Sequence, residues 1–144
     1  MTTIGMASDH AGFEYKERLK ALLLKKGYEV VDYGTDSADS CDYPDFAHRL
    51  GDAVDKGRVE LGVAFCGSGN GISMTLNKHQ KVRAALCWNS ELARLAKAHN
   101  NANVLAMPAR FISYRMATRI LGTWLSTSFE GGRHQRRIDK IPIK

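Results

Sequence analysis

The sequence has no apolar run long enough to cross a membrane. Its longest runs, at 61–66 and 84–88, are far shorter than the roughly 20 residues that span a bilayer. No basic segment followed by an apolar one opens the chain, so the sequence carries no recognisable secretion signal. We therefore expect a cytoplasmic protein with no membrane partner.

Cysteine is also scarce, and its placement excludes the common cysteine-based sites. The three cysteines, Cys41, Cys66 and Cys87, are odd in number and far apart, which fits neither a disulfide framework nor a C-x-x-C zinc or redox motif. The five histidines show no H-x-x-x-H spacing either. We expect free thiols, no metal and no other cofactor.

What the chain does have is the length and composition of one ordinary domain. It contains 144 residues, of which 44% are hydrophobic and 25% charged. Its net charge of +6 is concentrated at the end, because the segment 133–144 alone carries +4. We expect a single domain, 1–144, whose basic C-terminal tail, 131–144, faces nucleic acid, a phosphorylated small molecule or solvent.

Short apolar runs alternate with helical patterns along the chain. Short segments rich in apolar residues, at 4–8, 28–33, 61–66, 82–88 and 103–107, predict five strands. The segments between them carry apolar residues at the spacing of one helix face. Alternation with short, right-handed connections predicts an α/β fold in which a five-stranded parallel sheet lies between two layers of helices.

Polar and reactive residues follow four of the predicted strands. In sheets of this kind, ligands bind beyond the carboxyl ends of the strands. The residues at those ends are Asp9, His10, Asp42, Tyr43, the segment 66–71 and Arg110. We expect the ligand site there.

The segment 66–71, Cys-Gly-Ser-Gly-Asn-Gly, is the strongest local motif. Its alternating glycines permit positive φ and close ligand approach, so successive backbone N–H groups can converge on an anionic oxygen. A dinucleotide fingerprint would need glycine in place of Ile72, and the P-loop pattern is absent. A tight turn between strand and helix is the structural alternative. Cys66 is either an inert buried thiol or a base or nucleophile.

Other polar residues have a structural as well as a functional interpretation. Asp9 fits a helix N-cap, and His99 fits a helix end that favours positive charge. His10 has no structural explanation of this kind. In the segment 131–137, two glycines precede arginines and a histidine that together make a good phosphate clamp.

Taken together, the motifs resemble the ribose/galactose isomerase family, and within it the type B ribose-5-phosphate isomerases. The resemblance runs from about residue 4 to residue 137. The matching motifs are Ser8-Asp9-His10-Ala11-Gly12, Asp42-Tyr43-Pro44, Cys66-Gly67-Ser68-Gly69-Asn70-Gly71-Ile72-Ser73, Asn77-Lys78, His99-Asn100 with Asn103-Val104-Leu105, and Gly131-Gly132-Arg133-His134-Gln135-Arg136-Arg137. The resemblance implies a Rossmann-like three-layer fold. It also implies a homodimer that interconverts ribose 5-phosphate and ribulose 5-phosphate without a metal, a step of the pentose phosphate pathway.

The resemblance also implies roles for individual residues. The implied catalytic residues are Cys66 as the base at C2, His99 and Asp9 in ring opening, and Ser68 as a proton shuttle between O1 and O2. The implied substrate-binding residues are His10, Tyr43, Gly67, Gly69, Asn70, Gly71, Asn100, Arg110, Arg133, His134 and Arg137. Some relatives carry a glutamate base just after the last glycine of the loop, where this chain has Ile72, so the chain resembles the cysteine subgroup.

The predicted topology separates His99 from Cys66. His99 ends a helix just before the last strand, so within its own chain it lies near the opposite edge of the sheet from Cys66. We expect His99 and the basic tail to complete the pocket of a second subunit, in a two-fold homodimer with shared active sites.

Three alternatives remain open. Within the family, the substrate is alternatively allose 6-phosphate or galactose 6-phosphate. A non-enzymatic phosphometabolite-binding module would use the same loop and tail without a base. Nucleic-acid binding through the tail is the weakest alternative, because the tail has no aromatic residue on which bases stack. We therefore expect a small sugar phosphate, and no nucleic acid, as the ligand.

Overall fold

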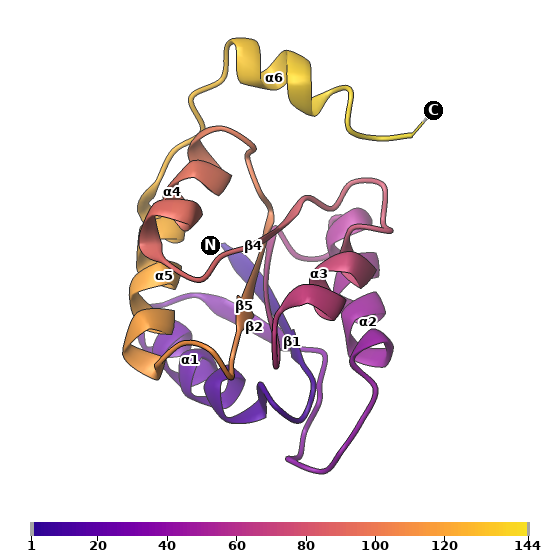
Figure 1. Cartoon of the computed structure of the whole chain (residues 1–144), viewed down its shortest axis with the longest axis vertical. Helices are drawn as coiled ribbons and strands as arrows, with labels where there is room; N and C mark the ends of the chain where they lie inside the picture. Colours follow the sequence, from indigo (N-terminus) through magenta and orange to yellow (C-terminus); the bar gives the residue numbers. More distant parts are fainter. Residues whose placement is uncertain (1, 144) are drawn as a thin grey trace.

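Five parallel strands form the centre of the molecule, described here from a computed structural model that covers residues 2–143 (Figure 1). The strands are β1 (Thr3–Ser8), β2 (Glu29–Asp32), β3 (Leu61–Cys66), β4 (Ala84–Leu86) and β5 (Val104–Pro108). They lie in the order β2-β1-β3-β5-β4, and every neighbouring pair is parallel. The parallel sheet predicted from the alternating pattern is confirmed.

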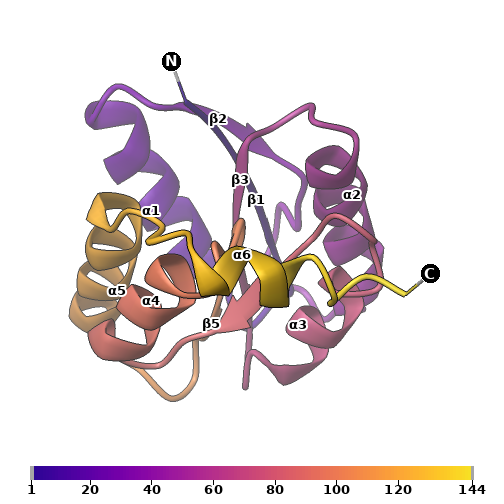
Figure 2. The same ribbon diagram turned by 90° about the horizontal axis from the view of Figure 1, so that it is seen from above.

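Helices cover both faces of the sheet. One face is covered by α1 (Phe13–Lys25), α4 (Ser90–Ala98) and α5 (Tyr114–Ser126), and the other by α2 (Tyr43–Asp55) and α3 (Asn70–Leu76) (Figures 1 and 2). None of the helices within residues 2–143 combines the length and the apolar character needed to cross a membrane. The layers are those of the expected α/β sandwich.

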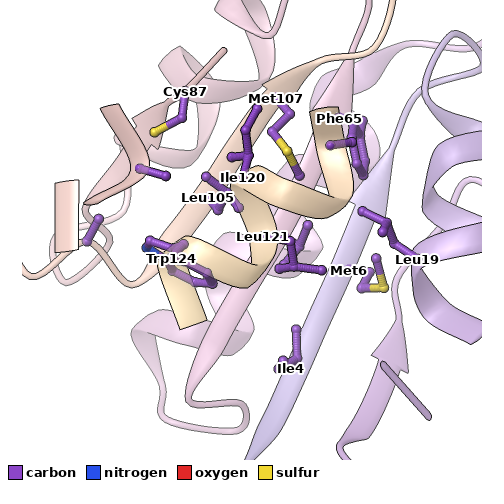
Figure 3. Packing of buried hydrophobic residues seen from close by; sticks show 14 of the residues in the cluster. Ile4, Met6, Leu19, Phe65, Cys87, Leu105, Met107, Ile120, Leu121 and Trp124 are labelled. Carbon is purple, nitrogen blue, oxygen red and sulfur yellow. The ribbon is translucent and has the colours of Figure 1, made fainter. Parts of the chain in front are cut away.

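Side chains along each strand alternate between the two faces of the sheet, and this divides the core into two unequal parts. Phe65 and Met107 belong to the buried cluster on the side of α1, α4 and α5, which also contains Trp124 of α5 (Figure 3). The next residues along the strands face the other side of the sheet, because side chains alternate between the two faces. On that side the strands present small residues such as Ala64 to α2 and α3, and Cys66 lies among them.

The strand at the edge of the sheet is shorter than the sequence suggested. The segment 82–88 was predicted to be a strand throughout, but only Ala84–Leu86 forms ladder pairs. β4 pairs with β5 on one side only, because it is the last strand of the sheet. An edge strand has few ladder bonds to extend it, so its ends depend on side chains nearby.

Part of the basic tail is helical, which the sequence analysis did not predict. Residues Arg133–Ile138 form α6, which buries His134 and Ile138. Gly131 and Gly132 precede it with φ of 71° and 59°, which lets the chain turn sharply into the helix. Seen from above, α6 crosses the sheet from the α4 side toward the α3 side (Figure 2). Lys144, the last residue of the predicted tail, lies outside the described residues.

Candidate active site

Most of the predicted site residues lie at the carboxyl edge of the sheet. Cys66 at the end of β3 pairs with Pro108 at the end of β5. The N–H of Asp9, which follows β1, donates to the carbonyl of Phe65 at 3.2 Å. The predicted residues at this edge are Asp9, His10, Tyr43, Cys66, Gly67, Ser68, Gly69, Asn70, Gly71 and Arg110.

Close packing, as well as turn geometry, requires the glycines of the loop 67–71. Gly69 has a φ of 76°, and a Cβ there would also overlap the side chain of Leu86. A Cβ at Gly71 would overlap the ring of Tyr43. A tight turn therefore explains Gly69 but not Gly71. Within residues 2–143, no N–H group of 67–69 has a hydrogen-bond partner, so the loop presents free donors suited to an anionic oxygen.

Cys66 is buried beside these donors. It is only 4% exposed, and its carbonyl accepts a hydrogen bond from the N–H of Ala109 at 3.0 Å. The three cysteines are free thiols, as expected. Burial raises the pKa of Cys87 to about 12, so that thiol stays protonated and inert. Of the two buried thiols, only Cys66 adjoins the free donors of the loop.

Asp9 and His10 are fixed by backbone contacts. The buried Asp9 accepts a hydrogen bond at Oδ1 from the N–H of Gly12 at 3.1 Å. The N-cap of α1 is Gly12, which excludes the structural interpretation of Asp9 as the cap of this helix. His10 accepts a hydrogen bond at Nδ1 from the N–H of Cys41 at 3.2 Å. In its neutral form, the His10 ring therefore carries its proton on Nε2, where it can donate to a ligand.

Tyr43 and Arg110 enclose the loop from two sides. The Tyr43 ring packs on Gly71, and the Arg110 side chain lies over Gly67. Beside them, the exposed Ser68 and the neighbouring Asn70 line an open hollow of about 310 Å³. The other walls of this hollow are Leu86, Trp88, Pro108 and Phe111. Sequence analysis did not identify these apolar side chains as part of the site region.

The remaining predicted site residues, His99, Asn100, Arg133, His134 and Arg137, lie at the opposite edge of the sheet. His99 is the C-cap of α4, and its ring stacks on that of His134 in α6 with centroids 4.3 Å apart and planes 11° apart. Arg133 and Arg137 are exposed on α6. The C-cap of α4, Asn100 and α6 thus bring together a second group of predicted site residues.

Glu130 joins this second group, and the sequence analysis missed it. Its N–H donates to the carbonyl of Ala98 at 2.9 Å, which ties the segment before α6 to the end of α4. Its Oε1 lies 3.8 Å from Nε2 of His99 and 3.5 Å from Nε2 of His134. The only signal in the sequence was its position four residues before His134, directly ahead of the glycine pair.

The His99, Glu130 and His134 side chains have the composition of a zinc site but not its geometry. Their ligand atoms lie within 4.8 Å of one another, and two histidines with one glutamate bind zinc in many enzymes. In a parallel stack, however, the two Nε2 lone pairs run side by side. A tetrahedral ion needs them to converge on one point at about 2.1 Å. Holding a metal would require one ring to leave the stack.

The two groups cannot meet on one small ligand within a single chain. The segment that carries His99 leads into the start of β5, whereas Cys66 pairs with Pro108 at its end. The length of β5, about 13 Å at 3.3 Å per residue, separates them. Two cavities of about 570 Å³ each lie beneath α6 and the C-terminal segment rather than at the glycine loop.

Comparison with known proteins gives one consistent answer. Residues 4–141 match the model of the Ribose/Galactose Isomerase family. The chain is 40% identical over 141 residues to ribose-5-phosphate isomerase B of Escherichia coli (strain K12), covering 98% of this chain and 95% of that one. It is 44% identical over 140 residues to the probable ribose-5-phosphate isomerase B of Mycoplasma genitalium, covering 96% and 92%.

Solved structures agree in fold as well as in sequence. Ribose-5-phosphate isomerase B of Clostridium thermocellum superposes with a TM-score of 0.96 at 44% identity, covering 97% of this chain and 95% of that one. The Mycoplasma genitalium enzyme with bound ribulose-5-phosphate superposes with a TM-score of 0.94 at 44% identity, covering 97% and 93%. The family suggested by the motifs is confirmed, and the chain belongs to the Ribose/Galactose Isomerase family.

Proposed function

We propose that this protein is an isomerase that interconverts ribose 5-phosphate and ribulose 5-phosphate. The observation that carries the proposal is a buried thiol, Cys66, next to a row of free backbone donors in a chain of this family. Its solved relative from Mycoplasma genitalium binds ribulose-5-phosphate. With this substrate, the reaction is a step of the pentose phosphate pathway, and we propose a cytoplasmic location for it.

In this proposal, Cys66 is the base that moves a proton between two carbons. Its thiolate removes the proton from C2 of the open-chain aldose, and the electron pair of that bond forms the C1–C2 double bond of a cis-enediolate. The proton then returns from Sγ to C1, while Ser68 carries a proton from O2 to O1. The N–H groups of the loop 67–71 stabilise the negative charge on the two oxygens.

The residues of the second group complete the reaction in the neighbouring subunit. His99 and the partner's Asp9 open the furanose ring, and Asn100 and the partner's Tyr43 orient the chain of the sugar. Phosphate is held by His10 and Arg110 of one subunit and by residues of α6 of the other. Those α6 residues are Arg133, His134 and Arg137. Arginine suits this task because its planar donors match two phosphate oxygens at once.

A two-fold homodimer is therefore part of the proposal. It is supported by the placement of the two groups at opposite edges of one chain, and by the exposed aromatic residues beside the glycine loop. Trp88 is 54% and Phe111 76% exposed, in the hollow next to Ser68. Exposed apolar surface of this kind is typical of a contact with another chain.

The activity is tested with ribose 5-phosphate, allose 6-phosphate and galactose 6-phosphate, together with a Cys66→Ser variant. We expect turnover of ribose 5-phosphate and exchange of its C2 proton in deuterated water. We expect Cys66→Ser to lower kcat by about 100-fold or more, because serine is too weak a base. A variant that keeps more than about a tenth of kcat removes Cys66 from the mechanism. Binding without proton exchange in the unmodified protein favours a non-enzymatic module.

The shared site is tested with mixed dimers. If Cys66 and His99 of one site come from different subunits, a dimer of one Cys66→Ala chain and one His99→Ala chain has one intact site. Refolding an equal mixture makes about half the dimers mixed, so about a quarter of all sites become intact. Activity should rise from near zero to that fraction. If both residues served one site from the same chain, refolding would restore nothing.

A further inference from the structure

The segment 99–103 between α4 and β5 carries His99 and Asn100 and has a strained backbone. Asn101 has a φ of 45°, the left-handed region that residues other than glycine seldom adopt. Its N–H donates to the carbonyl of Lys97 at 3.1 Å, which ends α4. His99 and Asn100 directly precede this turn, so its conformation contributes to the direction of their side chains, beside the contacts of the His99 ring with His134 and Glu130.

Arg83, the residue before β4, holds the turn. Its Nε and Nη2 both donate to the carbonyl of Asn101, at 3.1 and 3.0 Å. Its backbone N–H donates to Oδ1 of Asn103 at 2.7 Å, and its carbonyl accepts the N–H of Asn103 at 3.1 Å. The fork of the guanidinium thus closes on one carbonyl, while the backbone of the same residue fixes the far end of the segment.

The Arg83 guanidinium is a charged group that binds a main-chain carbonyl. Arg83 is half-buried, and burial lowers its pKa without neutralising it. Within residues 2–143 no carboxylate lies within ion-pair distance of it, so its charge is directed at a main-chain oxygen. Asn101 lies two residues beyond His99, the C-cap of α4, so the guanidinium holds the turn that follows the helix.

We propose that Arg83 is a positioning residue for the reaction: it fixes the turn at Asn101 so that His99 and Asn100 face the neighbouring subunit's substrate. The inference rests on the proposed function and on its shared site. Arg83 touches no substrate in this arrangement and acts only through the segment 99–103. A displacement of about 1 Å in a catalytic group costs as much as 100-fold in rate.

The first test compares Arg83→Met with Arg83→Lys. Arg83, Asn101 and Asn103 line the cavity beneath α6, so either side chain fits without a clash. We expect Arg83→Met to lower kcat by about tenfold or more with a smaller change in KM, because the phosphate contacts remain. Arg83→Lys keeps one donor for the Asn101 carbonyl and should recover part of kcat. Equal kcat in Arg83→Met and the unmodified protein overturns the proposal.

Asp55→Ala is the matched control. Asp55 accepts a hydrogen bond at Oδ1 from the N–H of Lys81 at 2.7 Å, and the Lys81 carbonyl accepts one from Nδ2 of Asn103 at 2.8 Å. This variant therefore loosens the turn before β4 and the far end of the segment 99–103, but it leaves the two hydrogen bonds from Arg83 to the Asn101 carbonyl in place. We expect its kcat to stay within about twofold of the unmodified protein. A loss as large as that of Arg83→Met would mean that any loosening near β4 lowers the rate, which contradicts a specific positioning role.

Mixed dimers show in which site Arg83 acts. Paired with Cys66→Ala chains, Arg83→Met chains should regain activity in about a quarter of the sites, as His99→Ala chains do. Paired with His99→Ala chains, they should regain nothing, because every site then receives one damaged segment. The reverse pattern would assign Arg83 to the Cys66 side and overturn the proposal, as would no recovery in either pair. If mixed dimers of Cys66→Ala and His99→Ala chains themselves regain no activity, the shared site is wrong. The role of Arg83 in positioning residues for a neighbour's site is then wrong as well.

Discussion

The arginines of α6 are free to bind a ligand. Arg137 is exposed, and within residues 2–143 it forms no ion pair. We expect Arg137→Ala to raise KM more than it lowers kcat, because a phosphate remote from the reacting carbons is held alike in the ground and transition states. The loss of binding free energy should be about 1.5 to 3 kcal/mol, the range for a hydrogen bond to a charged group. Steady-state kinetics with ribose 5-phosphate measures it, and unchanged kinetics would assign Arg137 to a merely solvated surface.

The thiols should differ in reactivity. Cys41 is half-buried, whereas Cys87 is 1% exposed and burial raises its pKa to about 12. We expect iodoacetamide to modify Cys41 in the folded protein and to leave Cys87 unmodified, because the thiolate is the reactive form. Peptide mass spectrometry gives the extent of modification at each site, and unfolded protein, in which all thiols react, is the control. Equal rates at Cys41 and Cys87 in the folded protein would contradict the burial of Cys87.

At the scale of elements, a buried ion pair joins α1 to β2. The fully buried Lys16 of α1 donates from Nζ to Oδ2 of Asp32 at 2.6 Å, and Lys20 donates to the same oxygen at 2.8 Å. Burial alone would raise the pKa of Asp32. Hydrogen bonds from Lys16, Lys20 and the N–H of Gly34 outweigh it and hold that pKa below its ordinary value.

This pair should make the fold sensitive to acid. A carboxyl group whose pKa is lowered by folding stabilises the folded state above its unfolded pKa of about 4, and the effect is lost as the pH falls through the folded pKa. We expect Asp32→Asn to be destabilised by roughly 1 to 3 kcal/mol at neutral pH. The difference from the unmodified protein should persist down to about pH 5 and shrink below it, as the pH falls through the unfolded pKa and then through the lower folded pKa. Thermal unfolding over this range measures it, and a constant difference would mean that Asp32 does not titrate differently on folding.

Elements with a long apolar pattern were predictable from sequence, and short ones were not. The run 61–66 coincides with β3, because a strand covered on both faces must be apolar throughout. α6 escaped prediction because its buried positions, His134 and Ile138, are too few to establish a helical period. β4 was overestimated because the number of ladder partners depends on sheet order, which no local pattern reveals.

The candidate site divides in the same way. The residues after β1, β3 and β5 could be predicted to meet, because parallel strands bring their carboxyl ends to one edge. The contact of Glu130 with His99 and the hydrogen bonds of Arg83 to the Asn101 carbonyl could not be predicted. Both join segments far apart in the chain through contacts that only the packed structure creates.

At the scale of the whole molecule, the proposed dimer predicts that activity depends on concentration. If each site needs two chains, specific activity should fall when the protein is diluted below the dissociation constant of the dimer. Light scattering at the same concentrations shows whether mass and activity fall together. Constant specific activity in a solution of monomers would rule out a shared site.

Phe111 tests which surface joins the chains. It is 76% exposed and lines the hollow beside the glycine loop. We expect Phe111→Asp to shift the loss of mass and activity to higher protein concentration, because a charge would be buried against the partner. Leu24→Asp is the control, since Leu24 is 53% exposed on α1, far from this hollow. If both variants dissociate alike, the hollow is not the contact surface.

The position of the two residue groups at opposite edges also limits how copies can associate. In the proposed assembly, each chain contributes one residue group at one edge and needs the complementary group of another chain at the opposite edge. Contacts of this kind build open filaments, unless a two-fold rotation makes each copy contribute to the same neighbour that contributes to it. In a two-fold pair, both residue groups of each chain are engaged, so association stops at the dimer. A substitution at Gly131 or Gly132 that redirected α6 would therefore change assembly as well as catalysis, because a closed dimer would be replaced by an open filament.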